Sequence, residues 1–94
     1  MITRPETNFY VSDAGFSVEV LGRTGMLYRE GDHVMGIYSE VSVPGPGIAI
    51  WAKTIRAWNP PFEAEAVTDE KREAIIRNIG EVVVFCRQSL TVMR

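Results

Sequence analysis

The sequence predicts an α+β fold: an antiparallel β-meander of four to six strands, one long C-terminal helix packed on one face, and a short final strand. The 94 residues suffice for a single small globular domain, residues 1–94, with one hydrophobic core. Short segments of alternating apolar and polar residues, separated by turn residues, come first, and a helical pattern follows. A sheet with one apolar face and a helix with one apolar stripe bury each other, so we expect two packed layers.

The first part of the chain gives the weakest signal. Residues 1–15 form a weakly patterned N-terminal segment, in which residues 8–11 are typical of a short strand and residues 12–15 of a turn. Apolar and polar residues alternate over residues 16–21, which predicts a half-buried strand. The two glycines within residues 22–25 then predict a chain reversal.

Two further strands are predicted around a tight turn. Residues 26–30 are rich in strand-forming types, and Glu-Gly-Asp-His at residues 30–33 is typical of a turn between strands. Residues 34–43 alternate again, which predicts a strand with one face in water. The opposite face of that strand carries Met35, Ile37, Val41 and Val43, with Ser39 as a gap.

Prolines delimit the last strand of the meander. Pro-Gly-Pro-Gly at residues 44–47 must interrupt the sheet, because proline lacks the N–H group that a central strand needs. Residues 48–55 are β-branched and alternating, so they predict another strand. The two prolines within residues 58–62 end the sheet region.

The long helix is predicted from its cap and from its apolar spacing. Thr68 is a favourable N-cap, and Asp69 and Glu70 place negative charge at the positive end of the helix dipole. Apolar residues then recur on one helical face over three turns: Ile75, Ile76, Ile79, Val82, Val83 and Cys86. Of these we expect the following to be buried: Ile75, Ile79, Val82, Val83 and Cys86.

Gly80 leaves two interpretations of where the helix ends. Glycine costs about 1 kcal/mol relative to alanine inside a helix, and residues 82–85 are of types that favour strands. Because the apolar spacing continues across Gly80, we expect the helix to run to about Arg87. The alternative is a helix that ends at Gly80 and a strand over residues 81–87. Residues 90–93 predict the short final strand.

Composition argues against several classes of function. A net charge of −2 does not suit a nucleic-acid binder, and no apolar run approaches the roughly 18 residues that span a bilayer. The single cysteine, Cys86, cannot form an internal disulfide, which is typical of a cytoplasmic protein. Five acids within eleven residues predict a solvated strip or, alternatively, a docking surface for a basic partner: Glu63, Glu65, Asp69, Glu70 and Glu73.

No set of residues predicts catalysis, a metal site or a cofactor. Zinc needs three or four ligands, whereas one histidine and one cysteine lie far apart in this chain. Cys86 falls on the predicted core stripe, which does not suit a reactive thiolate. No glycine pattern matches a phosphate-binding loop. We therefore expect Glu30, Asp32 and His33 to form a solvated turn.

Four aromatic residues are many for so small a chain: Tyr28, Tyr38, Trp51 and Trp58. Packing in the core or against the sheet is the simpler interpretation, because aromatic side chains dominate small cores. The alternative is that some of them anchor a partner, because tryptophan and tyrosine are frequent hot spots of protein interfaces.

Three segments together resemble a known family: residues 28–32, 47–61 and 67–79. They form a Tyr-x-Glu-Gly hairpin, an apolar strand ending in Ser/Thr-Ile-x-x-Trp with a proline-containing turn, and an acidic helix start with Ile-Ile before a short final strand. This order is similar to that of the immunity proteins of bacterial polymorphic toxin systems, in particular immunity protein family seventy-four, over about residues 25–93. Thr54 replaces an expected serine, and residues 87–89 lack an expected glycine.

The resemblance implies a non-enzymatic immunity protein that binds and neutralises a cognate toxin domain made by the same cell or its kin. Acidic residues would speed the encounter with a basic toxin, and aromatic residues would anchor it. The partner-binding candidates are Tyr28, Glu30, Asp32, Tyr38, Glu40, Trp51, Glu63, Glu65, Asp69 and Glu70. Trp58 and Pro60 are also family-like positions, and we expect them to hold the fold.

Two other functions stay open at this point. One is a small ligand-binding or regulatory domain that uses the sheet face near Trp51. The other is an enzyme that acts as an oligomer, with its site between chains. The sequence does not distinguish a monomer from a homodimer, and a neighbouring gene for a secreted toxin would favour the immunity function.

Overall fold

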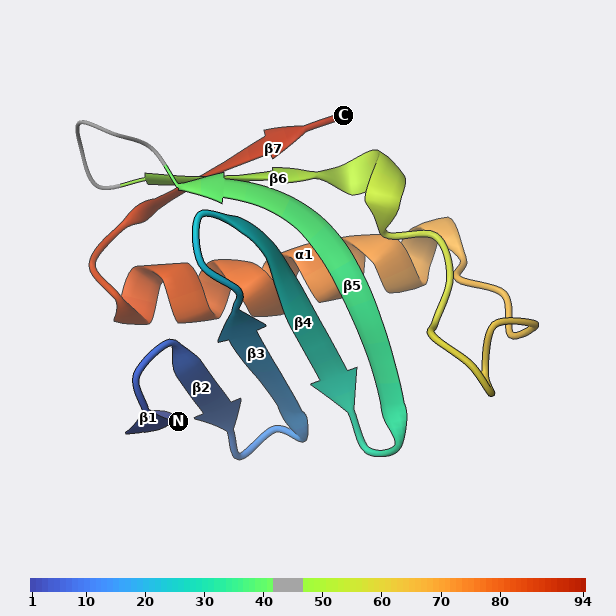
Figure 1. The fold of residues 1–94 in the computed structure, drawn as a ribbon, viewed down its shortest axis with the longest axis horizontal. Helices are drawn as coiled ribbons and strands as arrows, with labels where there is room; N and C mark the ends of the chain where they lie inside the picture. The colour runs from blue at the N-terminus through green and yellow to red at the C-terminus, as the bar shows by residue number, and fades with distance from the viewer. Residues whose placement is uncertain (42–46) are drawn as a thin grey trace.

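The structure, a computed structural model, describes residues 1–41 and 47–94. Its strands form one sheet in chain order, and a single long helix crosses one face of that sheet (Figure 1). The elements are β1 (Ile2–Glu6), β2 (Phe9–Ser12), β3 (Phe16–Val20), β4 (Thr24–Glu30), β5 (His33–Val41), β6 (Gly47–Trp51), the short 3₁₀ helix η1 (Ala52–Thr54), α1 (Asp69–Phe85) and β7 (Ser89–Met93). The α+β fold is confirmed, but the described sheet has seven strands where four to six were predicted.

The additional strand is β1, at one edge of the sheet. It pairs antiparallel with β2, and the register shifts between Thr3 and Glu6. Four of its five residues are exposed, and Pro5 lies within it. A strand with no buried face shows no apolar alternation, so the pattern of residues 1–15 did not predict this strand.

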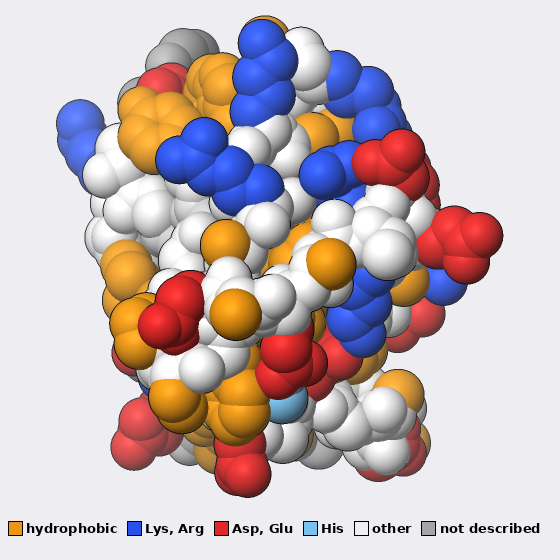
Figure 2. All heavy atoms as spheres, turned by 90° about the vertical axis from the view of Figure 1, so that its right-hand side faces the viewer, with side chains coloured by type: hydrophobic (Ala, Val, Ile, Leu, Met, Phe, Trp, Pro, Cys, Tyr) orange, Lys and Arg blue, Asp and Glu red, His pale blue; other side chains and the backbone are white. Residues whose placement is uncertain are grey.

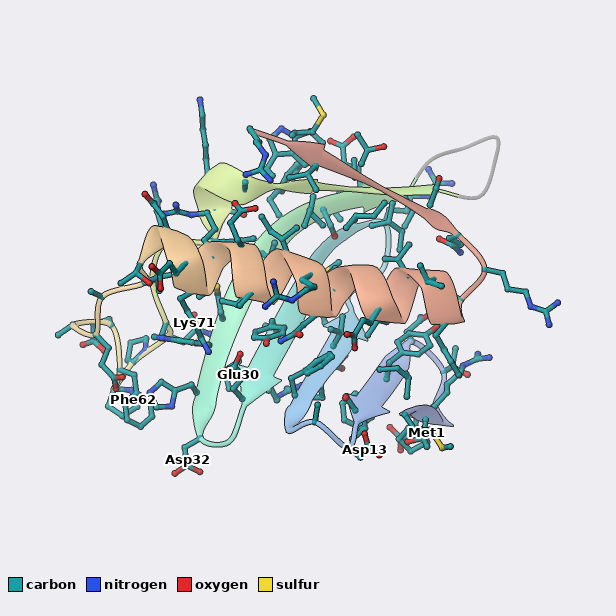
Figure 3. All side chains as sticks on the ribbon, turned by 180° about the vertical axis from the view of Figure 1, so that it is seen from behind. Met1, Asp13, Glu30, Asp32, Phe62 and Lys71 are labelled. Carbon is teal, nitrogen blue, oxygen red and sulfur yellow. The ribbon has the colours of Figure 1, made fainter. Side chains whose placement is uncertain are left out.

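The centre of the sheet is the predicted meander. Val18 of β3 lies opposite Tyr28 of β4, which lies opposite Met35 of β5. All three side chains are buried beneath α1. Alternation places these residues on one face, and α1 covers that face, as the opposite views of Figures 1 and 3 show.

The ends of β5 and β6 differ from prediction. In β5, Ser39 was expected to interrupt the apolar face, but it is buried and only 2% exposed. Val41 was expected on that apolar face, but it is 37% exposed. The predicted extension of β5 to residue 43, and most of the proline break at 44–47, fall on residues 42–46, outside the described residues. The strand predicted over residues 48–55 ends at Trp51, because η1 turns the chain and buries Ile55 completely.

The last strand pair departs from the predicted antiparallel meander. β7 runs parallel to β6, with Ile50 opposite Val92. The chain leaves β6, passes through α1 on one face of the sheet and returns in the same direction. A parallel pair requires such a crossover, and a helix is its usual form.

The helix crosses Gly80 without interruption, which confirms the longer of the two predicted helices; the strand predicted as an alternative over residues 81–87 is wrong. Thr68 caps the start, since its side chain accepts a hydrogen bond from the Lys71 N–H at 3.1 Å. The helix ends at Phe85, and Arg87 reverses the chain with a φ of 58°.

The core lies between α1 and the covered face of the sheet. Of the five helix residues that were expected to be buried, four are buried: Ile75, Ile79, Val82 and Val83. Cys86 is only half-buried, because it stands at the C-cap where the helix leaves the sheet. Within the described residues, no helix is long and apolar enough to cross a membrane.

Candidate functional site

The predicted partner-binding residues do not form one site. The fold distributes them over the core, the tip of the β4–β5 hairpin, the open face of the sheet and the start of α1. Each location gives the side chains different neighbours, and those neighbours decide which residues a partner can reach.

The open face carries an aromatic pair, which we call the aromatic patch: Tyr38 of β5 and Trp51 of β6. Their rings meet edge to face, with centroids 4.8 Å apart at 69°. Tyr38 is 42% exposed and Trp51 is half-buried. Met93, opposite Trp51 in the neighbouring strand, is 43% exposed and extends the apolar surface.

Hydrogen bonds hold the aromatic patch in place. The Tyr38 hydroxyl donates to Glu40 Oε2 at 2.7 Å, which raises the pKa of Tyr38 above its ordinary value. The Tyr38 N–H donates to Thr54 Oγ1 at 3.0 Å, and that hydroxyl donates to the Trp51 carbonyl at 2.7 Å. The two rings therefore present a preorganised surface, which lowers the entropy cost of binding.

Tyr28, in contrast, belongs to the core and has no exposed surface for a partner. Its hydroxyl donates to Glu30 Oε2 and accepts a hydrogen bond from Asn78 Nδ2 at 2.8 Å. Burial, followed by the hydrogen bond to Glu30, raises the pKa of Tyr28 well above its ordinary value. Lys71 Nζ donates to Glu30 Oε1 at 2.5 Å, so Glu30 turns toward α1 (Figure 3).

Lys71 and Asn78 were not predicted as part of this polar chain. They lie seven residues apart on α1, on either side of Ile75, which is buried. Helical spacing places all three on the same face. That spacing was the signal by which the two polar partners could have been found.

The hairpin tip is more structured than the solvated turn that was predicted. The His33 ring stacks on Phe62 with centroids 3.8 Å apart, and it meets Trp58 edge to face at 5.1 Å. His33 Nε2 lies 2.8 Å from Glu65 Oε2. The loop after η1 therefore packs against the tip, and only Asp32 points away from the protein (Figure 3).

Several predicted acids are already engaged in ion pairs. Asp69 binds Arg72 at 2.6 Å, and Glu65 lies within ion-pair distance of His33. Among the predicted candidates, the exposed acids that make neither an ion pair nor a side-chain hydrogen bond with a described residue are Asp32, Glu63 and Glu70. These three carboxylates are the ones most able to attract a partner of opposite charge.

Basic side chains gather around the short helix η1, on the side of the molecule that Figure 2 shows. Lys53, Arg72 and Arg94 line one shallow hollow around Ala52. Figure 2 shows lysine and arginine side chains over the upper part of this side, with acidic ones mainly below and to the right. The charge on this side of the molecule is thus separated into a basic and an acidic part, although the net charge is only −2.

The part of the chain that the structure describes offers no cluster of three or more histidine, cysteine or acidic side chains that could hold a metal ion. Glu30, His33, Glu65 and Lys71 do line one hollow beside Trp58. Each of these four groups is paired with another protein side chain, so the groups that line the hollow already contact one another.

Comparison with known proteins gives one match. The model of the family Immunity protein 74 matches residues 17–85, about three quarters of the chain. The match begins at β3, earlier than the expected residue 25, and ends with α1, before the final strand. No curated protein and no solved structure gives a significant match. The order of hairpin, strand and helix and the family match agree: this chain belongs to the Immunity protein 74 family.

Proposed function

We propose that this chain is a non-enzymatic, cytoplasmic immunity protein that binds a cognate bacterial toxin domain and neutralises it. Membership of the Immunity protein 74 family is the observation that carries the proposal. No catalytic step is needed for this function, because occupying the active surface of a toxin blocks it. The partner is a protein, and neither nucleic acid, a membrane nor a cofactor takes part.

The open face of the sheet is the surface we propose for the toxin. Its aromatic patch consists of the exposed Tyr38 and the half-buried Trp51, and hydrogen bonds hold the backbone of both residues in place. Residues of these two types supply much of the binding energy at protein interfaces. A stable interface covers about 800 Å² on each partner, so contacts would extend from the patch along β5 toward the hairpin tip.

Free acids near that tip would steer a basic toxin toward this face. Asp32 and Glu63 are exposed and make no ion pair with the described residues. Charges at the rim of an interface act mainly on the association rate. Asp32→Asn should therefore slow association and weaken its dependence on salt, whereas Glu81→Gln on α1 should do neither.

The proposal is tested by co-expression with the toxin domain encoded beside this gene. We expect the cells to survive and the two proteins to co-purify in fixed stoichiometry. Trp51→Ala should speed dissociation by about 30-fold, which corresponds to about 2 kcal/mol for a hot spot. Phe85→Ala is the matched control, because Phe85 is 45% exposed but lies on α1.

Circular dichroism would confirm that both variants remain folded. Equal cell death with and without this protein, together with no co-purification, would overturn the immunity function and favour the ligand-binding alternative. If Phe85→Ala weakens the complex and Trp51→Ala does not, the toxin binds the helix side instead of the open face.

A further inference from the structure

The two edge strands of the sheet differ in how well they resist pairing with another chain. β1 carries Arg4, Pro5 and Glu6, and its register against β2 is irregular. Charges, proline and irregular pairing are the usual means of keeping an edge strand single. β7, at the opposite edge (Figure 1), reads Ser-Leu-Thr-Val-Met, with neither proline nor charge, and among the described strands it pairs only with β6. This edge is therefore open to pairing with another chain.

A shallow apolar groove lies between β7 and the neighbouring flank of α1. Leu90 of β7 and Gly80 and Val84 of α1 are among the residues that line it. Val84 is 72% exposed and Leu90 is half-buried. The absence of a side chain at Gly80 lets Leu90 lie close to the helix. The strand edge thus offers hydrogen-bonding groups and the groove offers apolar area, side by side.

Two charges of opposite sign stand on the same flank of α1. Arg77 and Glu81 both line the groove, one helical turn apart and on either side of Gly80. Both are exposed, and neither makes an ion pair with a described residue. A two-fold axis brings the same patch of two copies together. A patch with one positive and one negative end is complementary to itself under that rotation, so the charges favour a second copy of this chain as the partner.

We propose that β7 pairs antiparallel with β7 of a second copy about a two-fold axis at Thr91. Leu90 then lies opposite Val92 of the second copy, and one sheet runs through both chains. Because the axis is perpendicular to the sheet, the two α1 helices lie antiparallel on the same face, and Arg77 of each copy meets Glu81 of the other. The open faces stay exposed, so the dimer does not depend on toxin binding and does not cover the aromatic patch.

The mass of the intact protein in solution gives the first test. One strand pair and one helix flank make a small interface, so we expect a dissociation constant in the micromolar range. Sedimentation equilibrium should show the mass rising to that of two chains as the concentration increases. Thr91→Lys places two like charges side by side at the axis and should raise the dissociation constant at least about tenfold. Thr3→Lys is the matched control, because Thr3 is also an exposed threonine in an edge strand.

A charge exchange on α1 gives a second, independent test. Arg77→Glu alone and Glu81→Arg alone each set like charges against one another across the axis, and each should weaken the dimer about tenfold. The double variant restores opposite charges and should restore the dimer. An Arg-Glu pair within one helix contributes only a few tenths of a kcal/mol. Melting curves of the dilute variants should therefore stay close to that of the original protein.

Three results would overturn this dimer. One is a mass of a single chain at every concentration up to about 1 mM, the upper end of the range in which weak association is detected. If, in addition, Thr91→Lys weakens the complex with the toxin, the edge belongs to the toxin instead of a second copy. Another is a dimer that Thr3→Lys dissociates and Thr91→Lys does not, which would place the contact at β1. The third is a dimer that neither single charge reversal on α1 weakens.

Discussion

Two tyrosines of this chain make the same local contact in opposite surroundings. Tyr28 donates to Glu30 and Tyr38 donates to Glu40, in each case two residues along the same strand face. Tyr28 lies under α1, and its hydroxyl also accepts a hydrogen bond from the side-chain amide of Asn78. Tyr38, in contrast, is 42% exposed. Surroundings, and not residue type, therefore decide which tyrosine supports the fold and which is free to meet a partner.

Removing the two hydroxyls should separate these roles. Tyr28→Phe leaves the Asn78 amide without its buried acceptor, so we expect it to lower the free energy of unfolding by about 1–3 kcal/mol. Tyr38→Phe, the matched control, should leave the urea midpoint nearly unchanged, because water replaces the lost partner. Equal effects of the two substitutions would show that Asn78 and Glu30 find other partners.

At the scale of the element, α1 is the part on which the core depends. Ile79 is completely buried in the middle of its apolar stripe, whereas Val84 on the same helix is 72% exposed. Ile79→Ala should cost about 2–5 kcal/mol in unfolding free energy, the range for truncation in a core. Val84→Ala should change it by less than about 0.5 kcal/mol, and a similarly small effect of Ile79→Ala would contradict the packing of this face.

Gly80 offers a stabilising change in the same helix. A methyl group added there would meet only Leu90 Cδ2 at 3.8 Å, an ordinary contact. Gly80→Ala should therefore raise the free energy of unfolding by about 1 kcal/mol, the difference in helix propensity.

Gly25 in β4 provides the contrast, because a methyl group there meets no atom but the backbone has a φ of +89°. Gly25→Ala should destabilise the protein, since residues with a side chain rarely adopt this conformation. Urea denaturation of both variants measures the two changes in the free energy of unfolding. Destabilisation by Gly80→Ala would mean that Leu90 cannot accommodate the added group.

At the scale of the whole molecule, side chains of α1 tie the helix to distant parts of the chain. Lys71 reaches Glu30 of β4, the Arg72 Nε donates to the Ile55 carbonyl at 2.9 Å, and Glu73 binds Arg94 at 2.7 and 3.0 Å. The sheet and the helix are thus fastened by polar contacts at the start of α1 and by apolar packing along its length.

The contact between Glu73 and Arg94 predicts a dependence of stability on pH. Hydrogen bonds from Arg94 lower the pKa of Glu73 below its ordinary value of 4.5. A carboxyl whose pKa is lower in the folded state stabilises the protein above its unfolded pKa, and that contribution is lost as the pH falls through the folded pKa. The loss therefore falls in the acid range below 4.5.

Glu73→Gln should accordingly lower the urea midpoint at neutral pH and lose its effect once the pH is below the folded pKa of Glu73. Glu81→Gln is the control, because Glu81 is exposed on the same helix and makes no ion pair with the described residues. A difference between wild type and Glu73→Gln that stays constant from neutral to acid pH would contradict the assigned pKa shift.

Local patterns in the sequence determined the central strands, the helix and its N-cap. The alternation around Phe16, Met26 and Ile37, the helical spacing across Gly80 and the capping of α1 by Thr68 depend on neighbours within a few residues, so the sequence displays them directly. The family was also within reach of the sequence, because the order of its motifs follows the chain.

Only the tertiary structure decided the direction of β7, the existence of β1 and the fate of the candidate residues. β1 has no buried face and therefore no pattern, and the parallel pairing of β7 depends on where the crossover helix returns the chain. Tyr28 and Tyr38 look alike in sequence, yet α1 covers one and leaves the other open. Contacts between segments far apart in the chain make this difference, and no local pattern records them.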